Sequence, residues 1–397
     1  MSERFKDILS ESKDALVTVM EAFLDEPSIM VCAVGMVFPI VELAIPFIKL
    51  VLCNEESSEV KYMKEQFQMV RDQLEDVADQ IADINKALKK KDIDTEFFKI
   101  EENLLFLFEK YMDIIDSKPK FQEGKKVQFV EDYEAFPADK DLHELYEAVM
   151  GNTAFGSSIL DFAMEYTEKH RRALEKYFAR LLKLFYLGLV IVIGYKAIKE
   201  ENSEKFKMQW KEKMHDVETK MKSLIDECID KFPEQARIDI LKECLRQEGG
   251  KSNCELAALI LGAVKEKYDW VSWSVQVFDQ QQSSKFTILP KKGEYHAHSE
   301  KNSLDFDDFS KRHVVVSYSS DPKPVDAARI QHFINELVVS DTKCEMSRAV
   351  AFIAHNLPGH VIHIVKESKK FECSHNFPKD SHFLGVYQKS QICVHSE

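Results

Sequence analysis

The sequence predicts a mainly α-helical protein: a bundle of long helices with coiled-coil-like packing, followed by a small C-terminal α/β domain. Gly and Pro are scarce, with 12 and 11 among 397 residues, about half their usual share, so turns are few. Apolar residues make up 45% of the chain, including 27 Phe, which is ample for a packed core. Apolar residues also recur at spacings of three and four over long stretches, as in helices that bury one face.

Two stripes of apolar residues carry the clearest helical period, one within residues 57–90 and one within 206–232. In the first, apolar residues step by three and four without a fault, which is the pattern of an a/d seam. We expect the stripes to bury each other as an antiparallel pair within the chain, the alternative being contact with a second chain. The stripes consist of Val60, Met63, Phe67, Val70, Leu74, Val77, Ile81, Ile84 and Leu88, and of Phe206, Trp210, Met214, Val217, Met221, Leu224 and Cys228.

The remaining elements follow from periodicity, which changes from helical to alternating after residue 266. Further helices are predicted at 3–24, 94–117, 121–135, 139–150, 156–200, 234–247 and 252–266. Strands are predicted at 270–278, 286–289, 314–318, 361–365 and 383–387, with helices at 324–339 and 345–356. The tail is therefore expected to be a small mixed α/β domain.

Charge is distributed unevenly along the chain. The net charge of −14 lies entirely in residues 1–263, whereas residues 264–397 are neutral and hold ten of the 13 His. This shift predicts two domains, an acidic helical bundle over 1–263 and a His-rich domain over 264–397. Such an acidic chain lacks the basic footprint of a general nucleic-acid-binding protein.

The eight Cys are scattered without a C-x-x-C pair, and the N-terminal residues are polar with no apolar signal segment. Both features predict a cytoplasmic protein with free thiols, one that can also associate with membranes. The sequence has no complete phosphate-binding loop, G-x-S-x-G elbow or H-E-x-x-H motif. Gly249-Gly250-Lys251-Ser252 is instead expected to end one helix and cap the next. We therefore expect no enzyme activity, catalytic residue or cofactor.

Some of the histidines after residue 290 have the spacing of possible metal ligands. Three pairs have spacings that zinc sites use: His296 and His298, His360 and His363, and Cys373 and His375. None is accompanied by a second Cys pair, and His360 and His363 should point to opposite faces of a strand. We therefore expect solvated or hydrogen-bonded histidines and no metal site.

Two apolar stretches, residues 29–52 and 181–198, are long enough to enter a membrane. Polar and Pro residues in the first share one helical face, which suits a segment that lines water in one state and is buried in another. Apolar all-round helices also form the cores of large bundles, and this interpretation stays open. The expected membrane-inserting residues are Ile29, Val31, Val34, Val37, Phe38, Glu42 and Lys49, and Leu184, Leu187, Val190 and Ile193.

Four basic residues precede the apolar centre of the second stretch and share one helical face. They are Arg172, Lys176, Arg180 and Lys183. Basic residues that flank an apolar centre suit the anionic headgroups of lipids. We expect these four side chains to bind headgroups.

Several runs of residues resemble the fish rapunzel proteins. They are 61–68 (KYMKEQFQ), 98–105 (FKIEENLL), 110–114 (KYMDI), 145–151 (LYEAVMG), 179–185 (ARLLKLF) and 268–273 (YDWVSW). The rapunzel family is similar to cephalotoxins of cuttlefish venom glands. The resemblance implies a helical body like that of pore-forming toxins, with apolar segments that can be concealed, and it supplies no catalytic or binding residues.

Two functional hypotheses follow. The first is a non-enzymatic helical protein that binds or inserts into membrane lipid, like a pore-forming toxin, and forms homo-oligomers. The second is a cytosolic regulatory protein that binds partner proteins through its helical seams or C-terminal domain, with both apolar stretches held permanently in its core. An enzyme is a third alternative, for which no nucleophile, base and orienting group can be identified.

Overall fold

The computed structural model describes most of the chain after residue 57. The described residues are 41, 42, 45, 58–90, 94–151, 158–246, 251–279, 296–299, 301–309, 312–340, 346–366, 371–387 and 390–397. The chain divides into two compact units, Met1–Lys231 and Phe232–Glu397. This boundary corrects the one predicted between residues 263 and 264. The sequence grouped the two helices after Lys231 with the bundle because they continue its helical pattern, but they pack on the sheet of the second unit.

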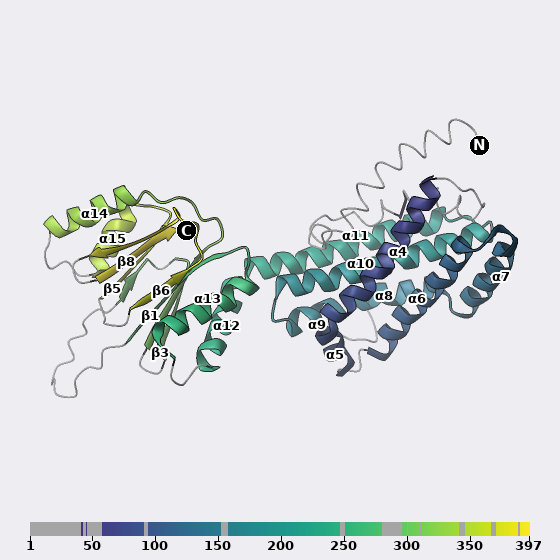
Figure 1. The fold of residues 1–397 in the computed structure, drawn as a ribbon, viewed down its shortest axis with the longest axis horizontal. Coiled ribbons are helices and arrows are strands. Elements are labelled where there is room, and N and C mark those ends of the chain that lie inside the picture. The colour runs from purple at the N-terminus through teal and green to yellow at the C-terminus, as the bar shows by residue number, and fades with distance from the viewer. Residues whose placement is uncertain are drawn as a thin grey trace. The chain divides into compact units, whose positions relative to one another are not determined.

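The first unit is a bundle of helices around one central helix, α10 (Figure 1). Its described helices are α4 (Ser58–Gln80), α5 (Ala82–Lys90), α6 (Asp94–Asp116), α7 (Pro119–Ala135), α8 (Ala138–Met150), α9 (Ile159–Tyr166), α10 (Arg171–Ile198) and α11 (Glu204–Asp230). Helix α10 contacts α4, α6, α7, α8, α9 and α11. The predicted long-helix bundle is confirmed, whereas the helix predicted at 3–24 lies outside the described residues.

Two of the predicted long helices are interrupted. The segment 57–90 forms α4 and α5, which are separated at Ile81. The segment 156–200 forms α9 and α10, because Glu168 and Lys169 adopt positive φ angles of 50° and 62° and turn the chain. Such left-handed conformations do not continue a right-handed helix.

Most of the described side chains of both apolar stripes are buried, but their main partner is α10 and not each other. Phe67 of α4 lies 6.4 Å, between ring centroids, from Tyr186 of α10. Trp210 of α11 lies 6.1 Å from Phe185 of α10. The predicted antiparallel pair of stripes is therefore wrong, because α10, which is apolar on every side, lies at the centre and takes both stripes as its cover.

The second unit consists of two four-stranded antiparallel sheets between two pairs of helices. One sheet has the order β3-β4-β1-β6 and the other β2-β5-β8-β7. Helices α12 and α13 pack on the first sheet, and α14 and α15 on the second. The elements are α12 (Phe232–Arg246), α13 (Asn253–Lys267), β1 (Ser272–Asp279), β2 (His296–His298), β3 (Ser303–Phe309), β4 (Arg312–Ser319), α14 (Ala327–Ser340), α15 (Met346–Asn356), β5 (His360–Lys366), β6 (Glu372–His375), β7 (His382–Tyr387) and β8 (Ser390–Ser396).

Strand alternation gives this unit two outer apolar layers and a middle layer that is largely polar and includes a small apolar cluster of Phe278, Val315 and Val365. On β1, Trp273, Val275 and Val277 pack against α12 and α13. The alternate residue Ser274 faces the other sheet, where its hydroxyl contacts His382 of β7 at 3.1 Å. The predicted α/β tail is confirmed. Strands β2, β3, β6 and β8 were not predicted, because their inward positions hold polar residues and the expected apolar alternation is weak.

The start of α13 confirms the interpretation of the Gly-Gly-Lys-Ser run as a helix boundary. Ser252 caps α13, and its side chain accepts a hydrogen bond from the backbone N–H of Glu255. The Glu255 carboxylate in turn accepts the backbone N–H of Ser252 at 2.7 Å. This reciprocal capping box stabilises a helix start.

We expect Leu74→Asp to destabilise the first unit strongly. Leu74 is 1% exposed, and an unpaired charge there would cost on the order of 3–5 kcal/mol. Thermal unfolding should show a melting temperature lower by roughly 10 °C. The matched control is Met69→Asp on the same helix, at a side chain that is 43% exposed, which should melt within a few degrees of the parent. Equal melting of both variants would show that the stripe is not buried.

Candidate functional site

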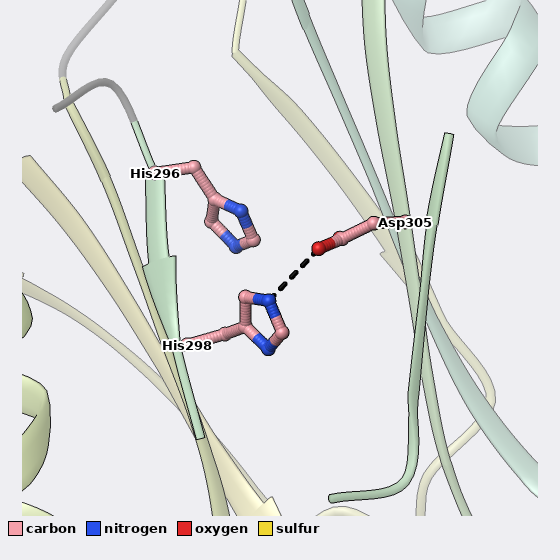
Figure 2. A group of neighbouring side chains, drawn as sticks. All are labelled: His296, His298 and Asp305. Atoms are coloured by element: carbon pink, nitrogen blue, oxygen red, sulfur yellow. Dashed lines mark ion pairs between the residues drawn. The ribbon is translucent and has the colours of Figure 1, made fainter. Parts of the chain in front are cut away.

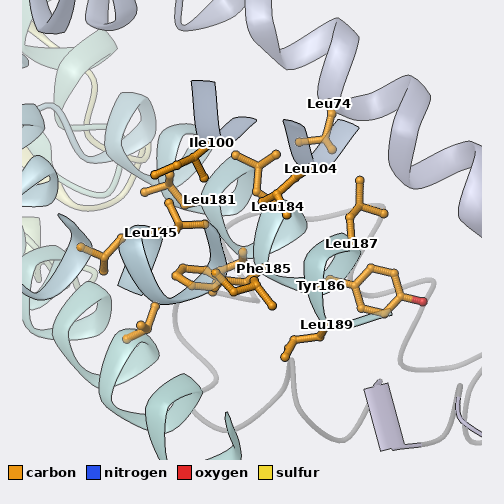
Figure 3. Packing of buried hydrophobic residues seen from close by; sticks show 14 of the residues in the cluster. Leu74, Ile100, Leu104, Leu145, Leu181, Leu184, Phe185, Tyr186, Leu187 and Leu189 are labelled. Atoms are coloured by element: carbon orange, nitrogen blue, oxygen red, sulfur yellow. The ribbon is translucent and has the colours of Figure 1, made fainter. Parts of the chain in front are cut away.

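Helix α10 is the strongest candidate for a functional segment in the first unit. Every residue from Tyr177 to Gly194 is buried, which is unusual because most bundle helices expose one face. Figure 3 shows side chains of α10 surrounded by Leu74 of α4, Ile100 and Leu104 of α6, and Leu145 of α8. Among the described residues, α10 is the helix long and apolar enough to cross a membrane, a test that the core helix of a soluble protein also passes.

Two glycines let neighbouring helices approach α10 closely. A Cβ atom added at Gly188 would lie 2.5 Å from Cδ2 of Leu142 on α8, and one added at Gly194 would lie 2.6 Å from the ring of Tyr111 on α6. Such distances are too short for non-bonded carbon atoms. The surface of α10 is therefore shaped to its neighbours at both places.

An ion pair is buried beside this apolar helix. Arg180 of α10 and Glu101 of α6 are both buried, and the Arg180 guanidinium donates to a Glu101 carboxylate oxygen. A second guanidinium nitrogen donates to the backbone carbonyl of Leu74 on α4. Arg180 thus joins α4, α6 and α10. The second Glu101 oxygen, Oε2, is buried without a hydrogen-bond partner in the described part of the chain, so the pair is incompletely compensated.

Lys183 lies one turn further along α10 and is 2% exposed. Its ammonium group donates to the side-chain amide oxygen of Gln73 on α4. Burial lowers the pKa of Lys183 from 10.5 to about 8, because an apolar environment disfavours the charged form. The closed bundle therefore holds Lys183 at a cost in free energy.

The four basic residues predicted to bind headgroups do not form one exposed stripe. Arg172 and Lys176 are exposed near the start of α10, and Arg172 pairs with Glu175 at 3.2 Å. Arg180 and Lys183 face the core instead and are enclosed by the bundle in this conformation. The expectation that the four residues bind headgroups stays a prediction. Leu184, Leu187, Val190 and Ile193, predicted to insert into membranes, are all buried in the bundle.

The first apolar stretch, residues 29–52, lies almost entirely outside the described residues. Val41, Glu42 and Ile45 are described, and they are buried, exposed and half-buried in that order. The exposed Glu42 agrees with the predicted polar face. Ile29, Val31, Val34, Val37, Phe38 and Lys49 lie outside the described residues.

The late histidines of the second unit gather between its two sheets. His296 and His298 of β2 lie beside Asp305 of β3, with one possible ligand atom from each residue within 4.8 Å of the others (Figure 2). His363 faces the same gap, with Nδ1 3.2 Å from Nε2 of His296. His360 is the half-buried first residue of β5, where its Nδ1 lies 3.2 Å from the backbone carbonyl oxygen of Pro358, and it takes no part in this group.

A second polar group lies in the same gap and contains Cys373. Its thiol lies 3.7 Å from the Ser274 hydroxyl, and His375 stacks on His382 with ring centroids 4.0 Å apart. Cys393 of β8 lies 3.0 Å from Nε2 of His382. Among the described residues, this group does not bring three potential ligand atoms together as the His296 group does.

Sequence reasoning missed Glu101 and Asp305. Both are carboxylates without a diagnostic motif, and each acquires its role from a basic side chain that is distant in the sequence. For Glu101 the usable signal was an acidic residue on an otherwise apolar helix face. For Asp305 there was none, because strand β3 itself was not predicted.

The helical part of the chain is similar to known proteins. The profile of the cephalotoxin-like middle helical domain matches residues 54–249. Protein rapunzel of Danio rerio is 30% identical over 217 residues, which cover 54% of this chain and 94% of that protein. The chain belongs to the rapunzel family. No solved structure matches it.

The match to the cephalotoxin-like domain includes the described helices from α4 to α12. In this rapunzel-family chain, therefore, α10 and the Arg180–Glu101 pair lie inside the domain that relates it to cephalotoxin-like proteins. The sheets of the second unit and their histidines lie after the matched residues. The resemblance to rapunzel predicted from the sequence is confirmed.

Breaking the Arg180–Glu101 pair from one side should destabilise the bundle by about 3–5 kcal/mol. Arg180→Met leaves Glu101 as an uncompensated buried charge, and Glu101→Leu does the same to Arg180. The double variant removes both charges and should recover most of the loss. Urea unfolding of the four proteins measures the coupling free energy between the two positions. Strictly additive losses would contradict a direct interaction.

The pH dependence of stability should reveal buried Lys183. Its folded-state pKa of about 8 lies below the unfolded value of 10.5, so the unfolded chain binds more protons between these values. This residue therefore makes the fold more stable as pH rises from 8 to 10.5. Lys183→Met has no such group, so its free energy of unfolding should not gain this contribution as pH rises. In urea unfolding, the difference in free energy of unfolding between Lys183→Met and the parent should therefore become smaller from pH 8 to pH 10.5. A difference in free energy of unfolding between Lys183→Met and the parent that does not change with pH would mean that Lys183 is hydrated in the folded state.

Proposed function

We propose that this protein is a non-enzymatic helical protein that binds membranes and inserts α10 into them after the bundle opens, with self-association of the opened chains. The supporting observation is α10 itself. Its 28 residues would extend about 42 Å at 1.5 Å per residue, more than the ~30 Å hydrocarbon core of a bilayer. The kinship with cephalotoxin-like proteins supports a concealed apolar segment.

The buried charges favour such an opening. Arg180 and Lys183 regain hydration when α10 leaves the bundle, so the closed state is less stable than a fully apolar core would make it. In an inserted α10 both lie at the N-terminal end of the apolar segment, where long basic side chains reach the headgroups. Arg172 and Lys176, exposed in the closed state, would make the first contact with anionic lipid.

A covalent tether tests whether α10 must leave the bundle. A Cβ atom at Gly188 would lie 2.8 Å from Cγ of Leu142. Because Cβ of Leu142 is one bond of about 1.5 Å from that Cγ, the two Cβ atoms would be at most about 4.3 Å apart, within the range of disulfides. The double variant Leu142→Cys/Gly188→Cys should therefore form a disulfide between α8 and α10. We expect the oxidised variant not to release dye from anionic liposomes between pH 5 and 7.5, and reduction to restore release.

Matched controls separate tethering from damage to the fold. Leu142→Cys alone should release dye under both redox conditions, and thermal unfolding should show the oxidised double variant folded. Gly188→Cys alone is not a matched control, because its Cβ atom would lie 2.5 Å from Cδ2 of the retained Leu142. Equal leakage from the oxidised and reduced double variant would contradict insertion of α10. If the parent protein released no dye from liposomes of any lipid composition, membrane insertion would be contradicted altogether.

Binding of a partner protein is the second candidate function. The observation that favours it is a groove of the first unit lined by Ile100 and Phe106 of α6 and by Phe136 just before α8. Phe106 and Phe136 are exposed, the latter by 58%, and exposed apolar side chains beside a groove suit protein contacts. This function would be favoured if the parent protein released no dye from liposomes and the backbone amides of α10 stayed protected from hydrogen exchange.

A further inference from the structure

The gap between the two sheets of the second unit holds a group of metal-ligand side chains. Residues two apart on a strand point to the same side, so His296 and His298 both enter the gap while Ala297 packs with α14 and α15. Asp305 enters from β3 of the opposite sheet, as Figure 2 shows. Two sheets thus supply an N,N,O donor set to one point.

The distances fit a metal ion after small side-chain rotations. The potential ligand atoms of the three residues lie within 4.8 Å of one another, and Nε2 of His298 is 2.8 Å from Oδ2 of Asp305. Ligand atoms in a tetrahedral zinc site lie about 3.3 Å apart, given bonds of about 2.0–2.1 Å. A metal ion would replace the hydrogen between His298 and Asp305, and this proton would leave to solvent.

Hydrogen bonds around the group already orient its rings. Nδ1 of His298 lies 3.1 Å from the backbone carbonyl oxygen of Ser299 and 3.2 Å from the Ser303 hydroxyl. These contacts orient the ring so that Nε2 faces Asp305. This is the outer-sphere arrangement that metal-binding histidines commonly have. His296 is held from its other side, because its Nε2 lies 3.2 Å from Nδ1 of His363.

His363 is a buried histidine that uses only one of its two ring nitrogens in a hydrogen bond among the described residues. The residue is 0% exposed, and its Nε2 has no hydrogen-bond partner in the described part of the chain. A buried polar atom without a partner is costly, and native structures contain few of them. Its presence next to His296 indicates that the polar group serves more than packing.

We propose that His296, His298 and Asp305 bind a divalent transition-metal ion, with zinc the best match to two imidazoles and one carboxylate. Three protein ligands leave a fourth position for water. The side chains of His298 and Asp305 are 25% and 33% exposed, so solvent can reach that position and the ion has a path of entry. The site is independent of the proposed membrane activity, because it lies in the other unit.

The test uses the full chain after dialysis against a chelator. Isothermal titration should show one zinc ion bound per chain, zinc should raise the melting temperature, and cobalt should give the visible absorption of a tetrahedral site with nitrogen and oxygen ligands. Asp305→Asn keeps the size and a hydrogen-bond acceptor, and we expect it to weaken zinc binding by at least about 100-fold. His298→Gln should do the same.

Matched variants locate the ion. His332→Gln removes an exposed histidine of α14 and should leave binding unchanged, which excludes adventitious surface binding. Cys373→Ser should also leave zinc binding unchanged. Each variant is compared with the parent in its metal-free melting temperature, and Asp305→Asn provides the test if His298→Gln does not fold. Absence of stoichiometric zinc binding, undiminished binding by folded Asp305→Asn, or loss through Cys373→Ser in its place would overturn the proposal.

Discussion

The organisation of the first unit depends on one constraint, that α10 has no side that tolerates water along most of its length. A helix of this kind must be enclosed, and six described helices of the unit contact it. The apolar stripes of α4 and α11 exist for this enclosure, which explains why they face α10 and not each other. Hydrophobic burial has no directional preference, so a central helix that is apolar all round can use every neighbouring stripe.

The charges beside α10 modify this picture. A core of this size has enough apolar area to be stable without Arg180, Glu101 or Lys183, and buried ion pairs contribute little net stability. Their presence makes a closed bundle that is specific in its packing and less stable than it could be. Such a balance supports the proposed release of α10 from the bundle.

The sequence predicted the class of fold well and the partners of individual residues poorly. Local periodicity placed α6, α7, α8 and α11 because each buries one face, and this signal is contained in the segment itself. It could not reveal that Arg180 meets Glu101 79 positions away, since contacts distant in sequence leave no local pattern. The burial of Arg180 and Lys183 could not be foreseen for the same reason: a side chain facing a buried carboxylate and one facing water look alike in sequence. Likewise, β2 and β3 alternate apolar residues with His or Asp. The His and Asp side chains face the gap between the sheets, and a sequence pattern does not distinguish this environment from solvent.

The polar middle layer of the second unit has a consequence for how this part of the molecule can change. Its two apolar cores lie outside the sheets, one under α12 and α13 and the other under α14 and α15. The polar residues that point into the gap between the sheets therefore contribute little to either core, although Phe278, Val315 and Val365 form a small apolar cluster of their own there. Substitutions at these inward positions can alter the chemistry of the gap while the layers that fold the unit stay intact. Such a separation lets a lineage acquire, exchange or lose a ligand set there without first rebuilding its hydrophobic packing.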